Sequence, residues 1–340
     1  MRNQAFAFLK PHAMGSQPVV NAVADRLEEA GVRVSHMERI GADRLVAEGL
    51  YDRHVGPVAR AALAPDPAAL FDADARARFA ERFEEPFAAV AAEGRLLSAP
   101  AAAARFEGGP DDLLRLCAMG GTETIAPDCH VLRFEPPCAC GHDHAHDHGH
   151  DCACGHDHAH AHDHGHDCAC GHDHGHAHGK PLYAVNAFYA AERAPYADPA
   201  GPGVMAMTLD FDLPWRDFLD VVIGDENPAG ALEESIRGFL YDRRDALGMR
   251  IDRFDNVLHA SVSPLDALCE KAIWLPAARR RADPLLKLLR ADARLPRRGL
   301  LPALQRLREA GTPGPALAGL DTPDAAPLVA EALLAEGSRA

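Results

Sequence analysis

The chain has 340 residues, a formal net charge of −15 at pH 7 and an apolar fraction of 47%. This length predicts one domain with large insertions, with two separate domains as the alternative. The acidic balance argues against nucleic acid and anionic membranes as partners, because both bind clustered Lys and Arg, and no apolar run approaches the roughly 20 residues that a membrane-spanning helix needs.

The first forty residues predict a strand, a helix and a second strand. Residues 3–9 alternate weakly and end at Lys10, before a proline that closes the strand. Residues 18–30 carry apolar side chains at helical spacing, and a glycine stop follows. Residues 32–40 alternate again as a strand. Taken alone, Lys10 would be a solvated amine at a strand end.

The next hundred residues are less informative. Residues 55–82 are rich in Ala, Pro and Arg, which favours inserted helices. Residues 94–135 predict only short helices and one strand, at 129–134.

A different composition begins at residue 138. The sequence Cys-Ala-Cys-Gly-His-Asp-His occurs three times between residues 138 and 179, a tract that holds 15 of the 20 His, six Cys and seven Asp. It has no branched aliphatic or aromatic side chain, so we expect residues 136–180 to be a disordered loop in the absence of a ligand. An idle polar linker is one interpretation. Metal binding is the other, and its expected ligands are Cys138, Cys140, His142, His144, Cys152, Cys154, His156, His158, Cys168, Cys170, His172 and His174.

The mixture of thiolate and imidazole in this tract suits zinc or nickel, with copper as a further alternative. Cysteines used as metal ligands fit a reducing compartment, and the N-terminus lacks a signal-peptide pattern, so a cytoplasmic location is predicted. Below a pKa of ~6.5 the imidazoles become cations. Charging all 15 would cancel the net charge of −15, which predicts metal release and poorer solubility in mild acid.

After residue 181 the pattern is globular again. Residues 204–211 predict a strand, residues 214–223 a helix and residues 224–228 a loop. Arg237 follows the loop, and its ordinary interpretation is a surface ion pair with a nearby glutamate. From residue 276 the chain reads as Leu- and Arg-rich helix, and its Pro- and Ala-rich end as a loose tail.

One histidine has an unusual setting. His259 follows Asn256 by three residues at the end of an apolar stretch, and the small residues Ala260 and Ser261 would leave its ring open to a ligand. A neutral imidazole can act as a nucleophile or a proton carrier, and Glu270 on the following helix could hold its other ring nitrogen. A histidine packed in the core is the alternative.

This segment resembles the active-site histidine segment of nucleoside diphosphate kinases. The positions that match that pattern are Asn256, His259, Ser261, Ser263 and Glu270, whereas Ala260 and Val262 depart from it. Two further segments match in the same order along the chain. Residues 8–13 resemble the family's strand-end lysine motif, with His12 in place of Asp, and residues 224–238 resemble its loop and phosphate-binding arginine.

The resemblance implies a phosphotransferase. His259 would take the terminal phosphate of a nucleoside triphosphate and pass it to a diphosphate, with Glu270 orienting the ring. Lys10 and Arg237 would stabilise the moving phosphoryl group, with Mg²⁺ bridging the phosphates.

The resemblance also implies the residues that hold the nucleotide. Asn256 would contact the sugar, and Tyr51, on a helix expected at residues 43–54, falls on the family's usual tyrosine. Phe87 would stack on the base, for which core packing is the alternative.

Some positions depart from the family pattern. Asp220 stands where a second phosphate-binding arginine is expected, and Glu226 replaces a threonine beside the loop asparagine. Both acids would repel a polyphosphate, and Arg250 is one of four later arginines that could replace the missing cation. The departures leave a second hypothesis, a zinc- or nickel-binding or storage protein on a scaffold that has lost turnover.

The expected fold is α+β, a ferredoxin-like antiparallel sheet with helices packed on one face. Residues 1–135 and 181–290 would be the two parts of the kinase-like domain, the first with a helical insertion, and residues 291–340 a helical extension with a loose tail. Family members form homo-oligomers, but the insertions could block the usual contacts.

Overall fold

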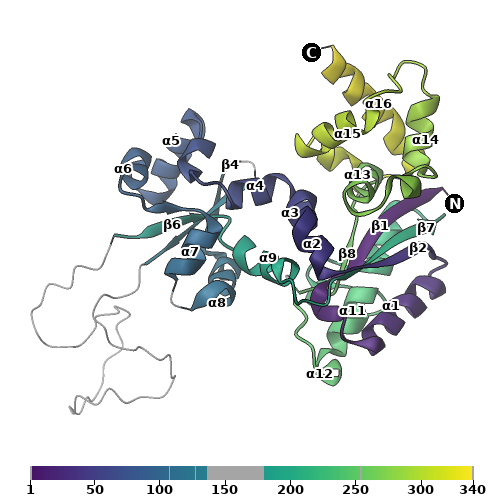
Figure 1. Cartoon of the computed structure of the whole chain (residues 1–340), viewed down its shortest axis with the longest axis horizontal. Helices are drawn as coiled ribbons and strands as arrows, with labels where there is room; N and C mark the ends of the chain where they lie inside the picture. Colours follow the sequence, from purple (N-terminus) through teal and green to yellow (C-terminus); the bar gives the residue numbers. More distant parts are fainter. Residues whose placement is uncertain (1, 107, 127, 136–179, 253–254, 339–340) are drawn as a thin grey trace, which may run out of the picture.

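The computed structural model describes residues 2–106, 108–126, 128–135, 180–252 and 255–338, which form two small, mostly antiparallel sheets and surrounding helices. The chain therefore has the α+β class that the sequence predicts. Figure 1 shows the first sheet beside the N-terminal end and a second group of elements around β4 and β6. The predicted metal-binding tract, with its ligands between Cys138 and His174, lies outside the described residues.

The first sheet joins strands that are far apart in the sequence. Its strands are β1 (Asn3–Leu9), β2 (Arg33–Ile40), β7 (Val204–Phe211) and β8 (Leu258–Ala260). The order across the sheet is β2-β7-β1-β8, and each neighbouring pair is antiparallel. The pairing of β1 with β8 sets Phe8 opposite His259, so the first strand positions the candidate nucleophile.

Helices cover both faces of this sheet. They include α1 (Gln17–Glu29), α2 (Ala42–Glu48), α3 (Leu50–Val55), α11 (Ile236–Asp242) and α13 (Pro264–Trp274). In β1, Ala5 and Leu9 pack with α1 and α11, whereas Phe6 and Phe8 pack with α2, α3 and α13. Figure 1 shows α1 and α11 on one side of the sheet and α13 on the other. The expectation of helices on one face is wrong, because β1 is apolar on both faces and each face must be buried.

Most regular elements predicted for this part of the chain are confirmed. The strands at 3–9 and 204–211 have the predicted bounds, and α1 differs from the predicted 18–30 by one residue at each end. The helix expected at 43–54 is broken in two at Gly49, where φ is 55°. The helix expected at 214–223 is α10 (Trp215–Asp217) followed by a π-helical turn; α12 (Arg244–Leu247) is a further short helix. None of the described helices combines the length and apolar character needed to cross a membrane.

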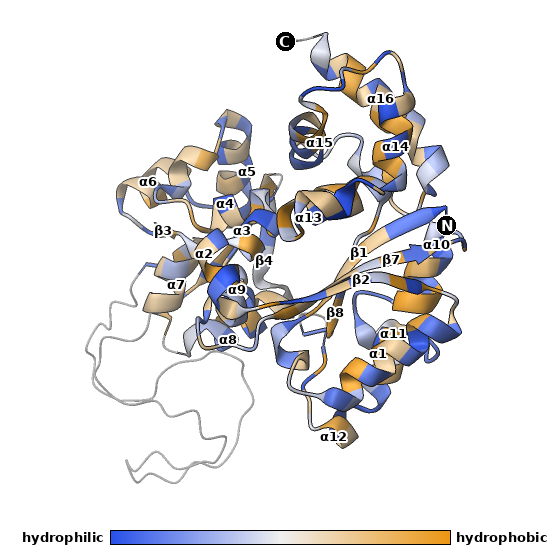
Figure 2. Cartoon of the chain, turned by 45° about the vertical axis from the view of Figure 1, so that its right-hand side comes forward, coloured by the Kyte–Doolittle hydropathy of each residue, from blue (hydrophilic) through white to orange (hydrophobic). Residues whose placement is uncertain are grey.

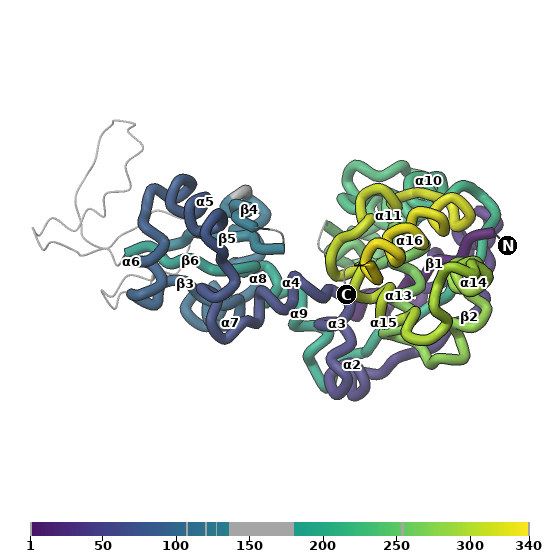
Figure 3. Tube along the Cα trace, turned by 90° about the horizontal axis from the view of Figure 1, so that it is seen from above, coloured from purple at the N-terminus to yellow at the C-terminus, as the bar shows by residue number. Residues whose placement is uncertain are grey.

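Residues 57–188 form a separate body, called here the inserted body, within the described ranges. Its helices are α4 (Pro57–Ala62), α5 (Ala73–Phe83), α6 (Phe87–Ala92), α7 (Ala99–Arg105) and α8 (Gly109–Leu116). Its strands are β3 (Leu96–Leu97), β4 (Thr122–Ala126), β5 (Cys129–Phe134) and β6 (Leu182–Val185), in the order β3-β6-β5-β4. Figure 3 shows this body beside the first sheet, with α9 (Tyr189–Ala197) between them.

This second sheet corrects the predicted domain organisation. The insertion was expected to be helical and part of a kinase-like unit over residues 1–135, but it has its own sheet and its own apolar clusters. Only β5 was predicted, with the observed bounds. The other strands span two to five residues, which is too short for an alternating pattern to be recognised.

The C-terminal residues form an ordered helical layer. Its helices are α14 (Pro284–Ala291), α15 (Leu300–Glu309) and α16 (Thr322–Gly337), which pack with α13 around Leu285, Leu304 and Val329. Figure 2 shows hydrophobic stretches along α14 and α16. Asp321 fixes this layer to the sheet, because its Oδ1 accepts hydrogen bonds from Asn3 Nδ2 at 2.8 Å and from Trp215 N at 2.7 Å. The predicted loose tail is therefore wrong for residues up to 338.

Candidate functional site

A strained turn presents His259 at the end of the first sheet. Leu258 N donates to Asn256 O at 2.7 Å across Val257, whose φ is 67°. This is a γ-turn with positive φ at a β-branched residue, a conformation that costs about 1–3 kcal/mol. The fully buried Val257 side chain and a 2.9 Å hydrogen bond from Lys10 N to Val257 O hold the turn. It brings Asn256 and His259 to the same cavity.

Glu270 on α13 orients the ring of His259. His259 Nε2 lies 3.1 Å from Glu270 Oε2, and Ser261 Oγ donates to the same oxygen at 2.5 Å. Burial alone would raise the pKa of Glu270, but the neighbouring His259 and the guanidinium of Arg308 outweigh it and lower the pKa to about 2. Glu270 is therefore an anion at neutral pH. It holds the proton on Nε2 and leaves Nδ1 as the nitrogen with a lone pair.

A second imidazole, not predicted from the sequence, lies against His259. The ring centroids of His54 and His259 are 4.5 Å apart with the planes nearly perpendicular. Trp274 Nε1 donates to His54 Nδ1 at 3.1 Å, and burial lowers the pKa of His54 to about 3. His54 is therefore neutral at physiological pH. Its spacing of three residues from Tyr51 on α3 was the available signal, because such residues share a helix face.

Arg308 reaches the same site from α15. Its Nη2 donates to Glu270 Oε1 at 3.2 Å, its Nε donates to Asp266 Oδ1 at 3.0 Å, and both Nη atoms lie 3.3 Å from His54 O. The extension thus supplies a cation to the carboxylate that orients His259. No local pattern in the sequence predicts these contacts, because Glu270 and Asp266 lie 38 and 42 residues away from Arg308.

The site faces a cavity of about 710 Å³ between the first sheet and the inserted body. Five predicted site residues line it: Lys10, Tyr51, Asn256, His259 and Glu270. The structure therefore brings together residues from three distant segments. A volume of this size is ordinary for a small-molecule site.

Lys10 and Asn256 present polar groups suited to a charged ligand. Burial lowers the pKa of Lys10, while the carboxylates of Glu192 and Asp255 oppose that shift. Asn256 Nδ2 donates to Glu226 O at 3.1 Å. Asn256 Oδ1 is buried and accepts no hydrogen bond within the described part of the chain.

Arg237 has a different environment from the predicted one. Its Nη1 donates to Gly224 O at 3.0 Å and its Nη2 to Leu258 O at 2.9 Å, and burial lowers its pKa to about 10. It is not among the residues that line the cavity. Arg237 ties the loop to β8, and no ion pair of its side chain is found among the described residues. Among the described residues, the arginines on the cavity wall are Arg250 and Arg308.

Phe87 lies in the core of the inserted body. It is 7% exposed, with ring centroids 5.1 Å from Phe71 and 5.4 Å from Phe79. Core packing, the alternative considered from the sequence, is correct, and the base-stacking assignment is wrong. The segment matched the family pattern, but the insertion carries it away from the catalytic sheet.

The two acids that depart from the family pattern have different positions. Asp220 is exposed and lies away from the cavity wall, whereas the exposed Glu226 forms part of that wall. Only Glu226 of the pair therefore faces a bound ligand directly.

Three groups at the site have the chemistry of metal ligands. Ligand atoms of His54, His259 and Glu270 lie within 4.8 Å of one another. Two of these residues already have other partners, since Trp274 donates to His54 and Arg308 to Glu270. A metal ion would compete with the existing partners of this group, which is described as a hydrogen-bonded network.

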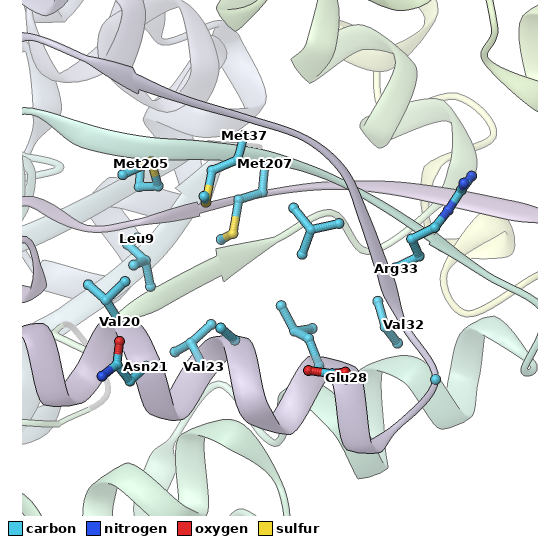
Figure 4. A pocket seen from close by; sticks show the side chains of 14 residues that line it. Leu9, Val20, Asn21, Val23, Glu28, Val32, Arg33, Met37, Met205 and Met207 are labelled. Carbon is cyan, nitrogen blue, oxygen red and sulfur yellow. The ribbon is translucent and has the colours of Figure 1, made fainter.

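A second cavity, of about 590 Å³, lies between α1 and the edge strand β2 (Figure 4). Most of the side chains that line it are apolar, including Val20, Val23, Met205 and Met207, and Glu28 and Arg33 are its charged members. None of the described residues that line it is a His, Cys, Ser or Thr. No protein-family model and no curated protein matches this chain.

Proposed function

We propose that the chain is a phosphotransferase that moves the terminal phosphate of a nucleoside triphosphate to a nucleoside diphosphate through a phosphohistidine at His259. The observation that carries the proposal is the pairing of His259 Nε2 with an ionised, buried Glu270 on the wall of a cavity that also contains Lys10. A carboxylate that holds one ring nitrogen makes the other a neutral nucleophile.

In the transfer step, a bond forms between the terminal phosphorus and Nδ1 of His259 while the bond from that phosphorus to the leaving diphosphate oxygen breaks. The proton on Nε2 remains between the ring and Glu270, whose charge stabilises the cationic phosphohistidine. The acceptor diphosphate reverses the step.

Cations on the cavity wall favour the polyphosphate. Lys10, Arg250 and Arg308 line the cavity, and positive charge fixed where phosphoryl charge moves is the main requirement of this chemistry. Mg²⁺ carried by the nucleotide would reduce the repulsion from Glu226. Asn256, which lines the cavity, would contact the sugar.

The arrangement of the first sheet supports the proposal. Counting β7 and β8 as the third and fourth strands of that sheet gives the order 2-3-1-4, which suits the ferredoxin-like fold expected from the resemblance to nucleoside diphosphate kinases. A cytoplasmic location is proposed with it. A homo-oligomer is proposed as well, with the insertions as the feature that would block the usual family contacts.

Labelling with γ-labelled ATP tests the proposal. The full chain should acquire an acid-labile, alkali-stable label that His259→Ala removes. His36→Ala is a matched control, because His36 Nε2 also lies 2.9 Å from a carboxylate, that of Glu38, away from the cavity. Label that persists in His259→Ala, or that never forms in the natural chain, contradicts the proposal.

A second candidate function rests on a separate observation. The repeated Cys-Ala-Cys-Gly-His-Asp-His sequence contains the ligands that zinc and nickel prefer. We propose transition-metal binding by this tract. If the chain acquires no label from γ-labelled ATP, metal storage on an inactive scaffold is the function that we conclude.

A further inference from the structure

The inserted body forms one wall of the catalytic cavity. Among the residues that line it, Leu114, Thr122, His130 and Phe188 come from the inserted body, whereas His259 comes from the opposite side. A ligand in contact with His259 and extending across this cavity therefore reaches residues outside the first sheet.

Charge is unevenly distributed around the cavity. Its lining includes three Lys and Arg side chains, Lys10, Arg250 and Arg308, and all of them lie outside the inserted body. The inserted body contributes one charged residue to the described lining, the acidic Asp111. The first side also contributes four carboxylates, Glu192, Glu226, Asp255 and Glu270, so phosphates would bind there at the three cations and not to the side as a whole. Because the inserted body supplies no Lys or Arg to the described lining, its wall suits the uncharged end of a phosphorylated ligand better than the phosphates.

Two aromatic rings stand on that wall. Phe188 and His130 are both partly buried, with ring centroids 6.1 Å apart and planes at 59°. His130 Nδ1 lies 2.9 Å from Thr124 Oγ1, which fixes the imidazole. A planar ring can stack on such a wall without a charged contact.

The backbone beneath these rings is firmly held. Asn186, fully buried with a φ of 48°, accepts from His130 N at 2.9 Å and donates to Val58 O and Asp128 O at 3.0 and 2.7 Å. Its own N donates to His130 O at 2.7 Å. One side chain thus joins β5 to the turn that carries Phe188, so the wall is formed before a ligand binds.

We propose that Phe188 and His130 bind the nucleobase of the phosphoryl donor, in place of the buried Phe87. This inference rests on the proposed function and names the substrate contact that the inserted body supplies. Because stacking uses the face of the ring, every base is accepted, and purines bind more tightly than pyrimidines through their larger face.

The test compares a ligand with a base and one without. Equilibrium binding of Mg-ATP and of Mg-tripolyphosphate is measured on the full chain and on Phe188→Leu, which keeps apolar volume but removes the ring. We expect the Kd for ATP to rise about five- to 150-fold, the effect of losing one stacked base. The Kd for tripolyphosphate should not change, and Phe188→Tyr should restore ATP binding.

Phe106→Leu is the matched control for packing. Phe106 belongs to the same apolar cluster as Phe188, and its ring centroid lies 5.7 Å from that of Phe134, but it does not line the cavity. The affinities of Phe106→Leu for ATP and for tripolyphosphate should therefore equal those of the unsubstituted chain. Equal loss of both ligands in Phe188→Leu, or no loss of ATP affinity, overturns the inference. Absence of label on His259 with an ATP-specific loss in Phe188→Leu would reject the transfer reaction and keep the base-binding wall.

Discussion

His54 and His259 are neighbouring imidazoles with different environments. His259 is paired with Glu270, whereas His54 accepts a hydrogen bond from Trp274 and is almost wholly buried. A charged His54 would compete with His259 for the carboxylate, since His54 Nδ1 lies 4.0 Å from Glu270 Oε1. Keeping His54 neutral therefore reserves Glu270 for the nucleophile.

The buried His54 predicts a specific pH dependence of stability. Its pKa is about 3 in the folded chain and about 6.5 when unfolded. Between these values the unfolded state binds more protons, so stability falls as the pH drops from 6.5 toward 3, by up to about 1.4 kcal/mol per pH unit. His54→Gln, which can still accept from Trp274, should flatten this slope.

Urea unfolding between pH 6.5 and 4.5 measures the slope. Glu270 does not obscure it there, because its stabilising effect is present above an unfolded value of about 4.5 and is lost as the pH falls through its folded value of about 2. Equal slopes in the natural chain and in His54→Gln would show that His54 is not held neutral by the fold.

Within the C-terminal helical layer, α15 contacts the site directly. It contributes Arg308, whose side chain is 21% exposed and forms an ion pair with the side chain of Glu270, which is 3% exposed. Removing one partner of a buried ion pair leaves the other charge uncompensated. The helix therefore supports the orientation of His259 through Glu270.

Replacement of Arg308 measures this support. Arg308→Ala should lower the free energy of unfolding by about 2 kcal/mol, a buried-pair value discounted for partial exposure. Arg308→Lys should lose less, because it keeps the charge but not the fork that reaches Asp266, Glu270 and His54 O. The urea midpoint at pH 7 is the measurement, and an unchanged midpoint in Arg308→Ala contradicts the role.

The elements also show which parts of the site the sequence could predict. His259 and Glu270 were predicted because a strand end and the following helix keep a local spacing, and Lys10 because residues 8–13 resemble the strand-end lysine motif of nucleoside diphosphate kinases. His54 and Arg308 were missed because their contacts depend on packing between distant helices. Phe87 was misassigned because a short local match contains no information about which body the segment joins.

At the scale of the whole molecule, strand periodicity predicted individual strands of the first sheet but not the elements that surround it. β1 and β7 have the predicted bounds, yet the second sheet was missed because its strands are short and its outer edges are formed by β3 and β4. The two faces of β1 were both apolar in the sequence, a signal that predicts cover on both sides and that the one-face interpretation overlooked.

The tract at residues 138–179 predicts an acid response of the complete chain. In the proposed metal-binding role, its 15 imidazoles would be ligands when neutral and would lose that ability as they become cations below a pH of ~6.5. Equilibrium dialysis against zinc should therefore give a lower stoichiometry at pH 5.5 than at pH 7.5. A chain with the tract replaced by a Gly/Ser linker of equal length should bind little zinc at either pH, and equal uptake by both chains would contradict the assignment.

The pairing of β1 with β8 has a consequence for synthesis. Phe8 is synthesised early, and its pairing partner His259 follows after tens of seconds at usual elongation rates. Arg308 and the contact of Asp321 with Asn3 come later still. A nascent chain can thus complete its inserted body before β1 has a neighbouring strand. The exposed apolar β1 is then the stretch that a chaperone would have to protect.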